Sequence, residues 1–411
     1  MKKITALFLL ACLMLALLPG CSTEKPDVWD GTVAESFSGG DGTADDPYTV
    51  TKASQLALLA AEINAGKDYT GKHVSLDRDL DLAMLDWTPI GNGTYSFNGT
   101  FNGNGHTITN LKITQGAYYT ETTAAGTHAR QYTIGLFGSC YNATVQGLSI
   151  DKADITVPIT GISFTVTAGV LAGTARADEQ LHFSDIHISR ATITPTLVGD
   201  DLLTNLRIGG AIGSIQGNKQ SSCTVERVQA DVQTSIRVGQ GRKNHIGGII
   251  GHLHIKNSGK IANCASYLSV DVDADTSFAN RNTFGALGYL GTVYHSNTIA
   301  VSGLFSRVAV HINHQPIYIN ELYTAHAIVG ELDTGYRGGE GYQFKDLYGY
   351  VEEIDDETGE KEASMQLYYI QYPDYPGCTA VNCLGCDTLP KEHGLDEGIW
   401  DLRDPSRPVL K

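Results

Sequence analysis

Three closely spaced cysteines near the end of the chain have the residue type and the spacing to carry chemistry. Cys378, Cys383 and Cys386 are separated by four and then two residues. This spacing is compatible with an iron–sulfur or zinc site, because thiolates bind both. In an exported chain the oxidising compartment favours a disulfide within the cluster instead. We therefore predict a disulfide cluster of undefined connectivity, and we expect no metal or other cofactor.

Two short runs alternate titratable and apolar residues, as a strand with one polar face would. Asp79 and Asp81 could bind a cation or form an acid–base pair on that face, or they could face solvent while the leucines enter the core. His252 and His254 also share one strand face, and His245 is close in sequence, so a lone metal site is the alternative to a structural role. We find no catalytic constellation by spacing, and we assign no catalytic residue and no metal ligand.

The elements that must position these residues are copies of a short glycine-bracketed phrase. Successive copies begin 34 to 42 residues apart, a period typical of repeat arrays. Glycine at such places indicates tight corners, which need either a positive φ or a close approach of backbones. The copies are Gly135–Gly138, Gly169–Ala172, Gly210–Gly213, Gly248–Gly251, Gly285–Gly288 and Ala327–Gly330.

A second pattern follows each copy, with apolar residues at its first and fourth positions and an apolar or small residue at its sixth. Its residues are mostly β-branched or aliphatic, which favours strands. One such unit cannot bury its own apolar face, whereas stacked units bring equivalent residues together in a continuous interior ladder. The pattern therefore predicts an all-β solenoid, with Cys264 buried on the ladder. Its instances begin at Val145, Phe183, Val225, Ile261, Val301 and Phe344, and an extra instance at Ile108 precedes the first copy.

Residues 51–66 have the pattern of an amphipathic helix. Thr51 can serve as the N-cap, and Gly66 lies where a C-terminal glycine is common. The apolar residues at helical spacing are Leu56, Leu59, Ala60 and Ile63. A single helix ahead of a strand array is expected to cover the first coil, whose edge would otherwise be open.

The beginning of the chain predicts export and a lipid anchor. Residues 1–20 combine an early positive charge with an apolar run too short to span a bilayer, as in a secretory signal. Leu18–Cys21 resembles the bacterial lipoprotein cleavage box, in which Cys21 becomes the lipidated N-terminus. Pro19 departs from the usual small residue, so a plain signal peptide is the alternative. Residues 21–45 predict a tether, and we expect a chain anchored at the outer membrane or cell surface.

Further motifs occur in order along the chain. They are Pro47–Val50, Asp79–Leu82, Trp87–Gly91, Gly99–Ile108, Ile399–Leu402 and Arg407–Lys411. Together with the Gly-Leu-Phe-Gly copies, this set resembles the GLUG-motif surface proteins. That family is common among gut Bacteroidetes lipoproteins and in the non-catalytic part of some bacterial IgA proteases.

The resemblance covers residues 46–411, and the regular repeat indicates that they form one domain. The implied fold is a single-stranded right-handed parallel β-helix of the pectin-lyase-like kind. Residues 46–91, with the short helix, would form its N-terminal cap, and residues 353–411, with their tyrosines and cysteines, its C-terminal cap. The resemblance implies no activity, because the family is mostly adhesin-like or uncharacterised and a shared fold does not establish chemistry.

Two tyrosine-rich segments are the predicted ligand contacts. The first lies in an insert at residues 115–131, since loops at one corner of a repeat commonly form the binding face. The second follows an acidic run, and its aromatic density suits stacking on sugar rings or on a protein partner. The alternatives are a solvated hairpin and a terminal cap. The predicted contacts are Tyr118, Tyr119, Tyr368, Tyr369 and Tyr372.

The charge balance limits the class of partner. The net charge is −16, and without residues 1–20 the chain has 27 basic against 45 acidic residues, or −18. This excludes nucleic acid and electrostatic attachment to anionic lipid as main partners. We favour a non-catalytic binding or adhesion protein for glycans or surface proteins. One alternative is a carbohydrate-active enzyme, a lyase or a glycoside hydrolase, although no flanking carboxylate pair is evident; the other is a passive stalk or assembly subunit.

Overall fold

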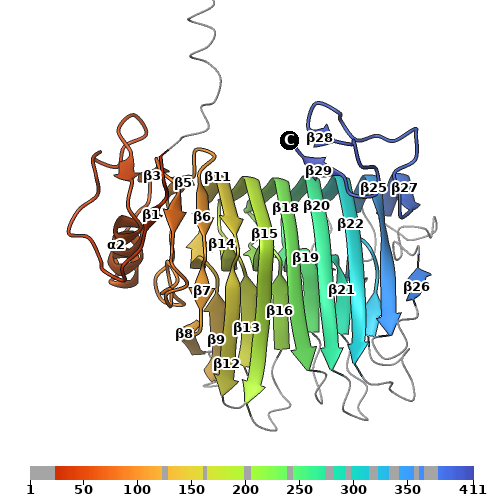
Figure 1. Ribbon diagram of the computed structural model, residues 1–411, viewed down its shortest axis with the longest axis horizontal. Coiled ribbons are helices and arrows are strands. Elements are labelled where there is room, and N and C mark those ends of the chain that lie inside the picture. Colours follow the sequence, from red (N-terminus) through yellow and green to blue (C-terminus); the bar gives the residue numbers. More distant parts are fainter. Residues whose placement is uncertain are drawn as a thin grey trace, which may run out of the picture.

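Parallel strands stacked in successive coils form most of the computed structural model (Figure 1). The structure describes residues 24–122, 128–160, 164–198, 205–237, 244–273, 282–291, 298–313, 323–332, 342–355, 361–364 and 378–411. Within these residues the strands form a 16-stranded sheet A, an 11-stranded sheet B and a two-stranded sheet near the C-terminus. The predicted all-β parallel solenoid, with a single short helix in the described part, is confirmed.

Sheet A contains the longest strands, which cross the front of Figure 1. Its strands are β1 (Asp27–Val28), β2 (Tyr48–Val50), β3 (His73–Leu76), β4 (Leu80–Asp81), β5 (Thr100–Asn102), β6 (Thr107–Thr109), β7 (Lys112–Ile113), β11 (Thr144–Asp151), β12 (Asp154–Thr160), β15 (Gln180–Val198), β18 (Ser222–Arg237), β20 (Ser258–Asp273), β22 (Thr298–Asn313), β25 (Tyr342–Asp355), β26 (Lys361–Ser364) and β27 (Cys378–Gly385). Leu148, Ile186 and Val228 are register partners and are all buried, as the ladder hypothesis requires. Cys264 is fully buried on the same ladder, as predicted.

A left-handed residue in each coil explains the two-residue gap in the second sequence pattern. The residue before the second apolar position has a φ between 52° and 65° in successive coils. The extra residue lets the strand bend while both apolar side chains still point inward. These residues stack from coil to coil, and Arg227 Nε donates to Asp185 Oδ1 at 2.5 Å. They are Asn110, Gly147, Asp185, Arg227, Asn263, Gly303, Asp346 and Asn382.

Each coil contributes two strand segments to sheet B, one before and one after the glycine-bracketed phrase. We call them the first and second arms. Its strands are β8 (Ala117–Thr122), β9 (His128–Ile134), β10 (Phe137–Tyr141), β13 (Phe164–Gly169), β14 (Ala172–Ala177), β16 (Asn205–Gly209), β17 (Ile212–Gly217), β19 (Asn244–Ile255), β21 (Asn282–Gly291), β23 (Tyr323–Ala325) and β24 (Val329–Leu332). In β19 and β21 one continuous strand passes through the bend. The apolar residues between the glycines, such as Leu136 and Ile249, are fully buried in the core.

Close backbone approach, not a positive φ, accounts for the glycines that bracket the phrase. None of the glycines in the six copies has a positive φ. A Cβ added at Gly213 would lie 2.6 Å from the Ala168 nitrogen and 2.8 Å from its oxygen. Gly251 has the same relation to Ile208, 2.6 Å from its carbonyl oxygen. Each second arm therefore packs directly on the backbone of a neighbouring first arm.

The N-terminal helix covers the first coil at one end of the stack (Figure 1). Helix α2 spans Ala53–Asn64, within the predicted residues 51–66, and all four predicted apolar residues are buried. Its N-cap is Lys52, not Thr51, because the Gln55 side chain turns back and accepts the Lys52 N–H at 3.1 Å.

The folded body begins earlier than the predicted boundary at residue 46. Strand β1 pairs in parallel with β4, and Trp29 is 8% exposed. Its ring contacts that of Trp87 edge-on, with the centroids 5.4 Å apart. Because an indole buried in this way fixes its neighbours, the segment from Asp27 onward belongs to the solenoid, not to the tether predicted at 21–45.

The C-terminal residues do not simply cap the end of the stack, as the predicted cap at 353–411 would. Strands β28 (Trp400–Asp401) and β29 (Val409–Leu410) form an antiparallel pair that lies over the edge of several coils (Figure 1). The Arg407 guanidinium pairs with Asp231, and the Leu410 N–H donates to Gln229 Oε1 at 3.0 Å. The segment thus returns along the outer face of sheet A and links β18 to later coils.

Candidate functional site

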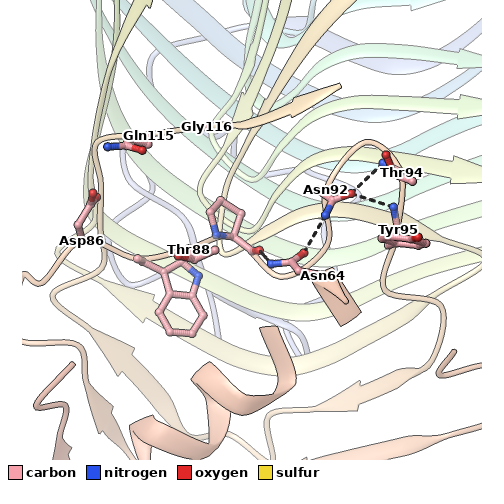
Figure 2. Close-up of a pocket in the computed structure, with 10 residues that line it drawn as sticks. Asn64, Asp86, Thr88, Asn92, Thr94, Tyr95, Gln115 and Gly116 are labelled. Atoms are coloured by element: carbon pink, nitrogen blue, oxygen red, sulfur yellow. Dashed lines mark hydrogen bonds between the residues drawn. The ribbon is translucent and has the colours of Figure 1, made fainter. Parts of the chain in front are cut away.

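An open pocket of about 430 Å³ lies where the N-terminal helix meets the first coils (Figure 2). Three separate parts of the chain line it: the end of α2, the stretch from 86 to 95, and the two residues that precede β8. Its polar and aromatic lining residues include Asn64, Asp86, Asn92, Thr94, Tyr95 and Gln115. Gln115 begins the insert at 115–131, for which the sequence predicts ligand contacts.

Local hydrogen bonds hold these side chains in place. Asn92 Oδ1 accepts the N–H groups of Thr94 and Tyr95 at 2.8 and 2.9 Å, which closes the turn that its Asn-Gly pair indicates. The Asn64 amide donates to the Pro89 carbonyl at 3.0 Å and accepts from Asn92 at 3.4 Å, as Figure 2 shows. These bonds tie the end of the helix to the turn, so the pocket is formed before any ligand arrives.

The pocket combines one aromatic ring with amides and a carboxylate. Tyr95 is 44% exposed, and its ring packs against Gly66, where a Cβ would lie 3.0 Å from the ring. Both Asp86 oxygens accept hydrogen bonds from Thr114, at 2.7 and 2.6 Å. Asp86 is the only carboxylate among the lining residues, so the pocket lacks the paired acids of a glycosidase. An exposed ring beside neutral polar groups suits a polyhydroxylated ligand.

Sequence reasoning missed Asn64, Asn92 and Tyr95 as site residues. Asn92 is followed by a glycine, and an Asn-Gly pair indicates a turn but not a site. Nothing in the local pattern indicated that the end of the helix, this turn and the insert would meet, because their proximity arises from the stacking of coils.

The predicted tyrosine contacts are only partly within the described structure. Tyr118 and Tyr119 belong to β8, which pairs in antiparallel fashion with β9 and extends sheet B as a hairpin. Tyr368, Tyr369 and Tyr372 lie outside the described residues, as does Cys21. These contact and anchor assignments stay predictions.

Two of the three clustered cysteines have described side chains, and both are free thiols. Cys383 and Cys386 are partly buried, and burial raises the pKa of Cys383 to about 11. The Cys378 backbone belongs to β27, while its side chain lies outside the described residues. The disulfide prediction therefore stays open. In the described part of the chain, no group of three or more His, Cys, Asp or Glu residues could hold a metal ion.

The alternating aspartates bind neighbouring coils. Asp79 Oδ1 accepts the Thr107 N–H at 2.9 Å and lies 3.0 Å from His106 Nδ1. Asp81 Oδ1 accepts from the Asn110 amide at 2.7 Å. Leu80 is fully buried between them, as the structural alternative predicted. Their carboxylates are thus engaged in hydrogen bonds between coils.

Fold and pocket together define a β-solenoid protein with an open polar pocket near its N-terminal end. No family model matches the chain. It is 33% identical over 198 residues to Halomucin of Haloquadratum walsbyi, and 36% identical over 132 residues to a protein of Evansella cellulosilytica provisionally described as a Gly-rich membrane protein. The matches cover 45% and 29% of this chain, but only 2% and 13% of those proteins.

Among solved structures, the chain is similar to a Bacteroides ovatus protein provisionally assigned as an immunoglobulin A1 protease. The identity is 16% and the TM-score 0.48, over 91% of this chain and 95% of the other. Within the described residues no helix is both long and apolar enough to cross a membrane.

Proposed function

We propose that the protein is a non-catalytic, surface-anchored binding protein that recognises glycans or glycan-bearing surface proteins. The observation that carries this proposal is the pocket of Figure 2, in which an exposed tyrosine adjoins amides that are already fixed by hydrogen bonds. Sugar rings present apolar faces to aromatic side chains and hydroxyls to amides and carboxylates. The resemblance of the sequence motifs to the GLUG-motif surface proteins adds support.

Replacement of Tyr95 by alanine is expected to weaken binding of a glycan ligand about tenfold, because aromatic contacts contribute on the order of 1 kcal/mol. Tyr95→Phe keeps the ring and should retain most of the affinity. The purified protein would first be tested on a glycan array, and each variant then measured by calorimetry with the best ligand. Since Tyr95 is 44% exposed, both variants should keep the thermal midpoint of the parent.

Two results would contradict this proposal. If the Tyr95→Ala variant binds the glycan as tightly as the parent, the pocket is not the binding site. Release of reducing ends or unsaturated products from the bound glycans would favour the alternative of a carbohydrate-active enzyme.

For the anchor, we propose lipidation at Cys21 and location at the outer membrane or cell surface. A Cys21→Ser variant should lose labelled palmitate and move from the membrane fraction to the soluble fraction, since two or more acyl chains are needed for stable attachment. Cys12→Ser, within the predicted signal segment, is the matched control and should keep the label. Persistent labelling of the Cys21→Ser variant would show that the anchor is elsewhere.

A further inference from the structure

Polar side chains from the two arms of sheet B meet at the bend, apart from the pocket of Figure 2, and we call this line of side chains the notch. Residues on either side of the glycine-bracketed phrase face each other across the bend. The hydroxyls of Thr167 and Thr174 are 2.7 Å apart, and the rings of His245 and His252 stack with centroids 5.3 Å apart. The notch continues along the stack to Tyr289, whose ring lies 4.5 Å from that of His252 and nearly parallel to it.

Register places Arg207 in the same notch. On the first arm Arg207 pairs with Thr167 on one side and His245 on the other. Register partners in parallel strands point to the same face of the sheet, so Arg207 faces the notch as they do. On the second arm the corresponding residue is Ser214, which pairs with Thr174 and His252 and is fully buried.

Two more basic side chains lie at the Arg207 end of the notch. Arg176 and His254 are on the second arm, in the row next to Ser214 and His252. The backbone of Glu331, on β24, is three strand steps or about 14 Å from that of Arg207 on β16. The Glu331 carboxylate nevertheless lies 3.4 Å from Nε2 of His245, the register neighbour of Arg207. The ion pair of Glu331 is thus with His245, and Arg207 forms none with it.

Two polar groups of the notch, the Arg207 guanidinium and His252 Nδ1, have no hydrogen-bond partner in the described residues. Arg207 is half-buried and forms no ion pair or hydrogen bond within the part of the chain that the structure describes. His252 is 8% exposed, and its Nδ1 has no hydrogen-bond partner there. A half-buried guanidinium and a buried imidazole nitrogen are both costly when unmatched. Burial lowers the pKa of Arg207, and burial together with the neighbouring Arg207 lowers that of His252.

We propose that this end of the notch binds a carboxylate group of an acidic ligand, with Arg207 as a bidentate donor and His252 Nδ1 as a second donor. A planar guanidinium matches the two oxygens of a carboxylate, and charge-assisted bonds of this kind are among the strongest that proteins form. The chain has a net charge of −16, so an arginine that forms no ion pair in the described residues is a local exception, and Arg207 would select an anion over a neutral ligand. The proposal extends the binding function above to a second site and to a charged class of ligand.

The test compares D-glucuronate with D-glucose, two sugars that differ by a carboxylate in place of a hydroxymethyl group. Titration calorimetry of the full chain at pH 7 should detect glucuronate and not glucose at this site, and Arg207→Gln should reduce the glucuronate affinity at least tenfold. The matched control is Arg403→Gln, because the Arg403 side chain is 91% exposed and paired with Asp401; it should bind as the parent does. Tyr95→Ala should also leave glucuronate binding unchanged, which separates this proposal from the first.

A second measurement distinguishes a ligand-binding arginine from a structural one. Without ligand, Arg207→Gln should keep or raise the thermal midpoint, because it removes a half-buried charge that lacks a partner. With saturating glucuronate, only the parent should gain stability. The proposal is overturned if the parent does not bind glucuronate, if Arg207→Gln binds it equally well, or if Arg207→Gln melts well below the parent without ligand.

Discussion

Replacement of Gly213 by alanine should remove about 3 kcal/mol or more of folding free energy, a large part of the roughly 5–15 kcal/mol by which folded proteins are stable. The added Cβ would lie 2.6 Å from the Ala168 nitrogen and from the Gly173 oxygen. Both contacts are with backbone, which cannot move aside as the end of a flexible side chain can. The two arms of sheet B would have to separate at this coil, and the ladder hydrogen bonds on both sides would be strained.

The matched control is Gly39→Ala. No atom lies within 4 Å of a Cβ added at Gly39, and its φ is not positive, so the change should alter stability by less than about 0.5 kcal/mol. Both variants would be compared with the parent by urea unfolding followed by circular dichroism. A Gly213→Ala variant with the stability of the Gly39→Ala control would show that the arms are not in backbone contact.

The sequence pattern predicted the solenoid because the same physical constraint recurs in every coil. Apolar residues such as Leu148 and Leu304 had to stack on equivalents, and the phrase around Gly210–Gly213 had to admit no side chain. Because the pattern repeats in several coils, each copy is separate evidence for the same stacked arrangement. Even the two-residue gap in the second pattern had a physical cause, since a left-handed residue such as Asp185 occupies it.

The pocket and the notch could not be predicted because each is formed once, by residues that break the repeat. Tyr95 and Asn92 lie in the stretch 86–95, ahead of the first glycine-bracketed phrase at Gly135. Arg207 and His245 occupy the position that is Thr167 in an earlier coil, so the periodic pattern treats them as equivalents although their chemistry differs. Sequence showed that the three histidines were near one another, but not that the bend would bring an arginine and Tyr289 to them.

The sequence also contained an indication of where the C-terminal segment lies, but it is on the outward-facing positions and not in the core pattern. The outward-facing position after the second apolar residue is polar in early coils, with His187 and Gln229 in contact at 3.0 Å. In later coils its register partners are Phe305 and Tyr348, both buried. Aromatic residues on an outward face need a cover, and the C-terminal segment supplies it. Reading the outer face separately from the inner one would have indicated where this segment lies.

Trp400→Ala is expected to lower the free energy of unfolding by about 3–5 kcal/mol, the usual cost of removing a buried tryptophan side chain. Trp400 is 1% exposed and lies at the centre of a small second core on the outer face of sheet A. The sheet residues of that core come from three successive long strands, β20, β22 and β25. Its buried members are Ala265, Tyr267, Phe305, Tyr348, Leu389, Leu395 and Trp400. Loss of the indole would leave a cavity between the segment and these strands, so the segment should detach.

Trp400→Phe is the informative control for this prediction. The indole Nε1 has no hydrogen-bond partner among the described residues, so phenylalanine loses volume but no bond, and it should cost less than half as much as alanine. Limited trypsin digestion adds a local readout, because Arg403 lies in the same segment and the chain should be cleaved after it much faster in the alanine variant. Since the segment contacts coils from β18 to β25, urea unfolding should report the loss across all of them. If cleavage accelerates while the free energy of unfolding stays within about 1 kcal/mol of the parent value, the segment covers the solenoid without holding its coils together.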